Sequence, residues 1–408
     1  GDTGQAEPQG SAHLAGTVYR IVNANDRPVV VGGVEYPPGE TVMAVETDET
    51  GWAQTGGHDL PFGTYAAVEV EAPEGYRLGL VDESGEETGE GASLTVTIDG
   101  EWSWKSYERD VRDHVVRGGL ALVKVDADLA EGAQGQATLA GAQFVVENAS
   151  EHAVVVDGTS FNPGETVATL TTDESGRAST GPRDLPYGTY LVRETQASNG
   201  YLVNETVWET YIQHDGDFAL VGGAADGAGA AQPVGFFESI AAFLSPTPAD
   251  AQEAAEEAPP SGEPVIPEQV IRGGVEIFKR DSENTDGTAQ GDTSLAGTRF
   301  AVISLNDNGT LVGGTVYQKG ETVMVLETDE QGRAASGNRD LPFGTYAVKE
   351  IKPPAGYLAP TAPTTQILTI ADDGVLASID NPFVNSPARG GLSLRKVDAE
   401  TSGDAPLG

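Results

Sequence analysis

The stretch "RDLPFGTYAVKE" (residues 339–350) occurs in two near copies, "HDLPFGTYAAVE" (58–69) and "RDLPYGTYLVRE" (183–194). In each copy Pro and Gly precede an apolar run that ends in a glutamate, which is typical of a turn that leads into a β-strand. Successive residues of a strand point to opposite faces. Because Tyr346 and Val348 share a face with Glu350, we predict that this glutamate points into the core with them.

A shared series of motifs surrounds the copies, so the chain is built from repeats. Each copy follows a Leu-Ala-Gly motif, a "GETV" motif and an acidic Thr-Asp-Glu turn, and precedes a Gly-Tyr pair. Short β-branched and aromatic runs lie between Gly, Pro, Asp and Asn, and no long pattern of 3.6-residue period appears. We therefore predict an all-β chain of tandem immunoglobulin-like β-sandwich domains.

The motif "RGG" marks the joints between repeats, at 117–119, 272–274 and 389–391. These joints predict repeat 1 over 1–116, repeat 2 over 117–271, repeat 3 over 272–388 and the first strand of a truncated repeat 4 over 389–408. Repeat 1 is expected to lack its first strand, so we expect the chain to be a piece of a longer array. Repeat 2 carries an Ala/Gly/Pro/Glu-rich insertion at about 222–263, which we expect to be disordered.

The bulk composition excludes several classes of function. The 408 residues carry a net charge of −40, which argues against nucleic acid and anionic membranes as partners. There is no cysteine, so disulfides, thiolate metal sites and thiol nucleophiles are excluded. No apolar run is long enough for a transmembrane helix. The histidines show no ligand spacing, and no Ser–His–Asp, P-loop or Rossmann pattern is present, so we expect no metal, no cofactor and no turnover enzyme.

Two further polar positions recur on apolar strand faces. A lysine lies six residues after the first glycine of each "RGG". An acid or amide lies five residues before the same glycine. The lysines are Lys124, Lys279 and Lys396, and the acids or amide are Asp113, Glu268 and Asn385. A single lysine of this kind would be interpreted as a charge at the solvent-exposed edge of the sandwich, because a buried lysine is unfavourable unless it is paired or neutral. The matching register in every repeat instead predicts that a lysine, a glutamate and an amide or acid meet in one core.

Such a cluster can form an amide bond between two of its own side chains, the lysine and the amide or acid. Desolvation lowers the pKa of a lysine and raises that of a glutamate, so both can be neutral in a core. A neutral lysine is a nucleophile, and a protonated glutamate can polarise a carbonyl and move a proton to the leaving group. Contact between the groups supplies a large effective concentration. The product would be a Lys–Asn bond with release of ammonia, or a Lys–Asp bond with release of water.

The motifs "GGLALVKVD", "LAGAQF", "TDESGRASTGPRDLPYGTYLVRET" and "EIKPPAGY" resemble the B-type domains of collagen-adhesin and SpaA-like pilin proteins of Gram-positive bacteria. The resemblance covers nearly the whole chain outside 222–263 and implies prealbumin-like sandwiches. It also implies that the lysine of the "KVD" strand bonds an Asn or Asp on the last strand, assisted by the glutamate.

Carried over to this sequence, the resemblance makes the repeats unequal. Repeat 3 is complete with Lys279, Glu350 and Asn385, and Asn381 is a second possible acceptor on the same face. Repeat 2 has Lys124 and Glu194 but has Glu268 where Asn or Asp is expected, so its bond would need an acceptor from 204–230. Repeat 1 has Glu69 and Asp113, and its lysine is missing from this sequence. Lys396 has no partner here.

The expected function is that of a stalk in a secreted, cell-wall-anchored adhesin or pilin of a Gram-positive bacterium, with an anchor outside this segment. Its partners would be neighbouring repeats of the same chain, and its chemistry would be single-turnover self-cross-linking. The alternative is that one repeat is itself the adhesive module and binds a host extracellular protein or glycan. The aromatic stretch at 101–107 is where such a surface would be sought.

Overall fold

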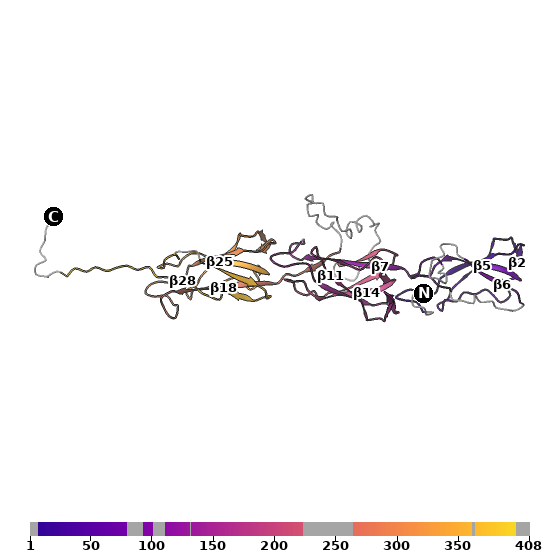
Figure 1. Ribbon diagram of the computed structural model, residues 1–408, viewed down its shortest axis with the longest axis horizontal. Coiled ribbons are helices and arrows are strands. Elements are labelled where there is room, and N and C mark those ends of the chain that lie inside the picture. The colour runs from indigo at the N-terminus through magenta and orange to yellow at the C-terminus, as the bar shows by residue number, and fades with distance from the viewer. Residues whose placement is uncertain are drawn as a thin grey trace. The chain divides into compact units, whose positions relative to one another are not determined.

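A computed structural model describes residues 7–79, 93–100, 111–130, 132–222, 264–360 and 364–396 (Figure 1). Strands and turns make up these residues, and none of them forms a helix long and apolar enough to cross a membrane. The expected insertion lies, apart from Gly222, outside the described residues, as does the aromatic stretch at 101–107. The all-β prediction is confirmed.

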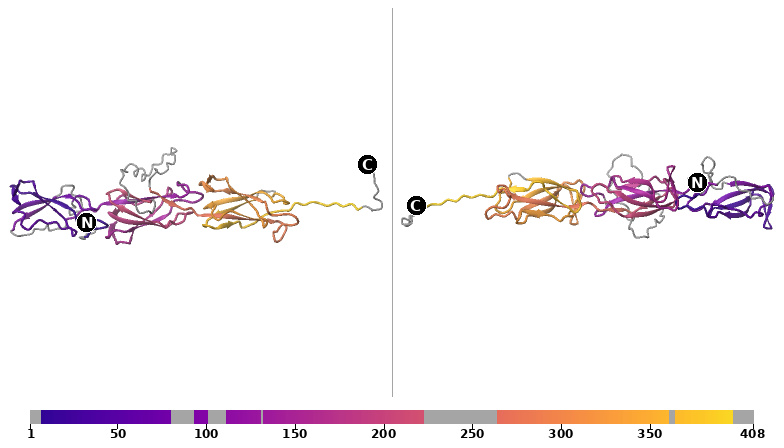
Figure 2. Two further views of the ribbon diagram at one scale, coloured as in Figure 1. Left: turned by 180° about the vertical axis from the view of Figure 1, so that it is seen from behind. Right: turned by 90° about the horizontal axis from the view of Figure 1, so that it is seen from below.

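Repeat 3 is a sandwich of two sheets (Figures 1 and 2). One sheet has the order β22-β19-β25-β26, formed by β19 (Arg299–Ser304), β22 (Thr322–Glu327), β25 (Gly344–Lys352) and β26 (Thr365–Ile370). The other is built on β18 (Arg272–Asp281), which pairs with β23 (Arg333–Ala335), β24 (Leu341–Pro342), β27 (Leu376–Ser378) and β28 (Phe383–Asn385). A hairpin of β20 (Thr310–Val312) and β21 (Thr315–Tyr317) completes it. The strand that opens with "RGG" is therefore the centre of the second sheet.

Repeat 2 repeats this topology. Its first sheet has the order β11-β8-β14-β15, with β8 (Gln143–Asn148), β11 (Thr166–Thr171), β14 (Gly188–Gln196) and β15 (Val207–Ile212). Its second sheet is built on β7 (Arg117–Asp126), which pairs with β12 (Arg177–Ser179), β13 (Leu185–Pro186), β16 (Phe218–Val221) and β17 (Ile266–Glu268). The hairpin consists of β9 (Val154–Val156) and β10 (Thr159–Phe161).

Repeat 1 has one such sheet among its described residues. The sheet has the order β4-β1-β5-β6, with β1 (Val18–Asn23), β4 (Thr41–Glu46), β5 (Gly63–Glu71) and β6 (Ser93–Ile98), and β2 (Val29–Val31) pairs with β3 (Val34–Tyr36). The sheet that β7 and β18 organise in the other repeats has no counterpart in the described part of repeat 1. Its buried apolar cluster is correspondingly small, with Ile21, Val42 and Tyr65 among its members.

The chain divides into two compact units. Gly1–Ala133 with Thr138–Gln269 form the first, and Gln134–Ala137 with Val270–Gly408 form the second. The first unit thus holds repeats 1 and 2. Residues 389–396, where the strand of a fourth repeat was expected, form no strand, and Leu392 and Leu394 are 83% and 86% exposed. A strand needs a neighbour to pair with, and none of the described strands pairs with this segment.

The core-facing alternation of the glutamate strand is as predicted. Tyr346 and Val348 of β25 are fully buried and Glu350 is 8% exposed, whereas Ile351 on the other face is 50% exposed. The alternation follows from the two-residue period of the strand and places a carboxyl group in the core of the sandwich.

Candidate functional site

The site in repeat 3 forms where three strands meet in the core. β18 pairs in parallel with β28, so that Lys279 lies opposite Phe383 and Asp281 lies opposite Asn385. β25 belongs to the facing sheet and contributes Glu350, which lies opposite Phe300 of β19. The first and last strands of the repeat therefore run side by side, and the glutamate approaches them from across the sandwich.

The side chains of repeat 3 contact one another in this core. Lys279 is 1% exposed; its Nζ donates a hydrogen bond to the carbonyl oxygen of Phe383 at 3.2 Å and lies 3.8 Å from Oε2 of Glu350. Nδ2 of Asn385 donates a hydrogen bond to Oε1 of Glu350 at 2.7 Å. Oδ1 of Asn385 is buried and has no partner among the described residues. The structure thus brings together the lysine, glutamate and asparagine that the sequence singles out.

Burial changes the protonation of this lysine. Desolvation lowers the pKa of Lys279 to about 8, although the charges of Glu350 and Asp281 oppose the change. A sizeable fraction of the amine is then neutral near physiological pH and carries a free lone pair. The side-chain amide of Asn385, which contacts Glu350, has an unsatisfied carbonyl oxygen, and this is an unfavourable state for a buried polar atom.

The second possible acceptor lies elsewhere. Asn381 is exposed, and its backbone carbonyl accepts a hydrogen bond from the side chain of Gln366 at 2.9 Å. Asn385 is 4% exposed and contacts Glu350. The two asparagines share a strand parity, but only Asn385 reaches the cluster because Asn381 precedes β28.

Repeat 2 has one lysine between two glutamates. Nζ of Lys124 lies 3.1 Å from Oε1 of Glu194 and 3.6 Å from Oε2 of Glu268, and all three side chains are buried. Oε2 of Glu194 also accepts a hydrogen bond from the backbone N–H of Asn204 at 2.6 Å. The side chain of Asn204 donates to the carbonyl oxygen of Pro267 at 3.2 Å and accepts from the N–H of Thr206 at 3.0 Å. The side chain of Asn204, the asparagine of the described part of 204–230, is therefore engaged away from the lysine.

Repeat 1 has one buried acid, Glu69, one half-buried acid, Asp113, and no lysine beside them among the described residues. Glu69 is 3% exposed, and neither of its carboxyl oxygens has a hydrogen-bond partner of normal geometry, although the N–H of Gly79 lies near enough to act on its pKa. Burial and the neighbouring Asp113 raise the pKa of Glu69 to about 7. Burial likewise raises the pKa of Asp113 to about 6. Both acids therefore hold protons at a pH at which a solvated carboxyl group has lost its own.

A tyrosine–aspartate pair that was not among the predicted site residues supports the lysine strand. The hydroxyl of Tyr357 donates to Oδ2 of Asp281 at 2.8 Å, and that of Tyr201 donates to Oδ2 of Asp126 at 2.9 Å. Nζ of Lys124 also lies 5.0 Å from the centre of the Tyr201 ring. The pair could have been found in the sequence, because each aspartate ends a "KVD" or "KRD" motif and each tyrosine belongs to the closing Gly-Tyr pair.

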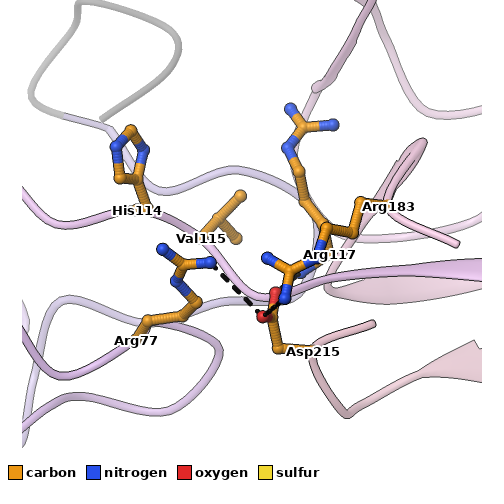
Figure 3. A pocket seen from close by; sticks show the side chains of 6 residues that line it. All are labelled: Arg77, His114, Val115, Arg117, Arg183 and Asp215. Atoms are coloured by element: carbon orange, nitrogen blue, oxygen red, sulfur yellow. Dashed lines mark hydrogen bonds and ion pairs between the residues drawn. The ribbon is translucent and has the colours of Figure 1, made fainter. Parts of the chain in front are cut away.

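A separate hollow lies in the first compact unit, lined by Arg77, His114, Val115, Arg117, Arg183 and Asp215 (Figure 3). Oδ2 of Asp215 contacts Arg77 at 3.3 Å and Arg183 at 2.6 Å. These side chains are partly exposed, and ion pairs of this kind contribute little to stability. The hollow holds no nucleophile beside a base, and the described residues contain no group of His, Asp and Glu that could hold a metal ion.

The family model of the SpaA prealbumin-like fold domain matches the chain three times, over residues 6–101, 120–223 and 275–382. No curated protein matches the chain. Similar solved structures include the TIE protein of Bacillus anthracis, which is 20% identical with a TM-score of 0.48 and is matched over 92% of this chain and 48% of its own. This chain thus spans about half of that protein.

Two pilins are further examples. The streptococcal ancillary pilin is 17% identical with a TM-score of 0.24, and the match covers 94% of each chain. BcpA, the major pilin subunit of Bacillus cereus, is 14% identical with a TM-score of 0.27, and the match covers 92% of this chain and 95% of that one. The three family matches together cover more than half of the residues, and the chain therefore belongs to the SpaA prealbumin-like fold domain family.

Proposed function

We propose that this chain is a stalk segment of a Gram-positive cell-surface pilin or adhesin that is exported and anchored to the cell wall. Its tandem domains form internal isopeptide bonds between their own side chains. The three SpaA-type domains support the stalk, with repeats at 1–116, 117–271 and 272–388 as the units and neighbouring repeats as their partners. The observation that carries the proposal is the buried cluster of repeat 3, in which Glu350 contacts both Lys279 and Asn385.

The bond forms between the side chains of Lys279 and Asn385. The neutral Nζ of Lys279 attacks Cγ of Asn385, and a C–N bond forms. Glu350 already accepts a hydrogen bond from Nδ2 of Asn385, so it is positioned to pass the proton lost by the lysine to the departing nitrogen. The C–Nδ2 bond breaks and ammonia leaves. Neither a cofactor nor an oxidant is needed, because one amide replaces another.

The position of the bond suits a stalk. β18 opens the repeat and β28 ends it, and the two strands are parallel neighbours. A pull on the two ends of the repeat would shear this pair and then unravel the sandwich. A covalent bond from Lys279 to Asn385 would carry the load directly between the first and last strands and leave the intervening residues unstretched.

Mass spectrometry of the full chain tests the proposal. The wild-type chain should have lost one ammonia in repeat 3, and a digest should yield one peptide pair joined at Lys279 and Asn385. The Lys279→Ala and Glu350→Ala variants should regain that ammonia. Lys352→Ala, an exposed lysine at the end of the same strand as Glu350, should keep the loss. Wild-type peptides with Lys279 and Asn385 both unmodified would overturn the proposal.

A further inference from the structure

We propose that Glu268 is the acceptor of Lys124, so that repeat 2 joins its own first and last strands by a lysine–glutamate amide. The inference rests on the proposed self-cross-linking of repeat 3 and extends it to a different acceptor. It removes the need for an acceptor from another part of repeat 2.

The strand register places Glu268 in the acceptor position. β17 pairs in parallel with β7, so that Ile266 lies opposite Lys124 and Glu268 lies opposite Asp126. β28 and β18 have the same pairing in repeat 3, where the acceptor lies opposite Asp281. A glutamate has one methylene more than an asparagine or aspartate. From this position its carboxyl group still lies in the core, with Oε2 3.6 Å from Nζ of Lys124.

The two glutamates beside Lys124 are not equivalent. Glu194 accepts a hydrogen bond from Nζ of Lys124 at 3.1 Å and another from the N–H of Asn204 at 2.6 Å. Both oxygens of Glu268 are buried without a hydrogen-bond partner. Its contact with the lysine, at 3.6 Å, is longer than a hydrogen bond. This asymmetry assigns the role of base and proton carrier to Glu194 and the role of electrophile to Glu268.

Burial favours the neutral acid that this role requires. Desolvation raises the pKa of Glu268 to about 8; the charge of Lys124 opposes the rise and that of Glu194 adds to it. With two acids and one lysine, full ionisation would leave an uncompensated negative charge in the dry core, which is unfavourable. A protonated carboxyl group loses hydroxide far more readily than a carboxylate loses oxide, so neutral Glu268 is the reactive form.

The reaction balances without any external reagent. A proton passes from Nζ of Lys124 to Glu194, Nζ attacks Cδ of Glu268, and the C–N bond forms. Glu194 gives its proton to the leaving hydroxyl group and accepts the second proton that Nζ loses. The C–OH bond breaks and water leaves. The equilibrium favours the amide here because the reacting groups are held in contact and the released water escapes from the buried site.

Mass spectrometry of the full chain distinguishes this bond from that of repeat 3. The wild-type chain should lose one water in addition to one ammonia, and a digest should contain a peptide pair joined at Lys124 and Glu268. The Glu268→Gln variant keeps the shape of the side chain. It should form the same link but lose ammonia in place of the water. Glu194→Ala should abolish the link, whereas Glu209→Ala, an exposed acid on the neighbouring β15, should keep it.

Two outcomes separate failure of this inference from failure of the proposed function. Loss of ammonia alone, with Lys124 and Glu268 in separate unmodified peptides, would overturn the lysine–glutamate bond and leave the bond of repeat 3 standing. An unmodified mass for both repeats would overturn both. A water lost from Glu268→Gln as well as from the wild type would show that the water comes from another residue and would also overturn the inference.

Discussion

Replacement of Lys279 by methionine is expected to lower the melting temperature of repeat 3 by roughly 15–25 °C. The proposed bond closes a loop of about 100 residues, and a cross-link of that span stabilises a domain by about 5 kcal/mol in the chain-entropy model. For a domain of this size each kcal/mol corresponds to roughly 3–5 °C in melting temperature.

The substitution changes little else in the core. Methionine fills a volume similar to that of the lysine side chain, so its effect on packing is small. The hydrogen bond from Nζ to the carbonyl oxygen of Phe383 is lost, which costs about 1 kcal/mol. A fall several times larger can therefore be assigned to the covalent bond.

Differential scanning calorimetry of the full chain, with the mass measured on the same sample, provides the assay. Lys352→Met, at an exposed site, should melt as the wild type does. Asn385→Ala should reproduce the fall, and the double variant with Lys279→Met should fall little further because both changes remove one bond. An unchanged melting temperature in Lys279→Met, with the bond present in the wild type, would refute the reasoning.

Three further measurements test the protonation of Lys279 and Glu69 and the role of the tyrosine–aspartate pair in repeat 3. In chain that is synthesised in a cell-free system and folds for the first time at a set pH, the rate of ammonia loss from repeat 3 should rise as the pH passes through about 8, because Lys279 must be neutral to attack; a rate that falls over this range would contradict the mechanism. The pKa of Glu69 is raised from 4.5 to about 7, so the folded state binds more protons and repeat 1 should lose stability as the pH rises between these values. Hydrogen exchange of β5 should report that loss, and Glu69→Gln should flatten the dependence. Tyr357→Phe should lower the free energy of unfolding of repeat 3 by about 1 kcal/mol while the ammonia loss persists, because the hydroxyl supports Asp281 and takes no part in the reaction.

The face of each site residue could be predicted because it follows from local geometry. Glu350 shares the buried face of Tyr346 and Val348, and Lys279 shares that of Val275 and Ile277. The two-residue period of a strand is a property of the backbone and needs no knowledge of the fold. The recurrence of the positions in register then distinguished a cluster from scattered charges.

The choice between acceptors could not be predicted in the same way. Asn381 and Asn385 have the same parity, so alternation cannot separate them. The pairing of β28 with β18 separates them, since it begins at Phe383 and leaves Asn381 exposed. For Glu268 the sequence indicated an unsuitable residue type, whereas the register of β17 on β7 shows that its longer side chain still approaches Lys124.

Motif order and strand period are readable in the sequence, so the all-β class, the repeats and the residues whose side chains face each core could be predicted. The tertiary structure alone decided which of those residues meet. Strands far apart in the chain must pair before Lys279 contacts Glu350, or Lys124 lies between Glu194 and Glu268. It also decided the protonation of Lys279 and Glu268, since the pKa of each depends on the burial that the closed sandwich provides.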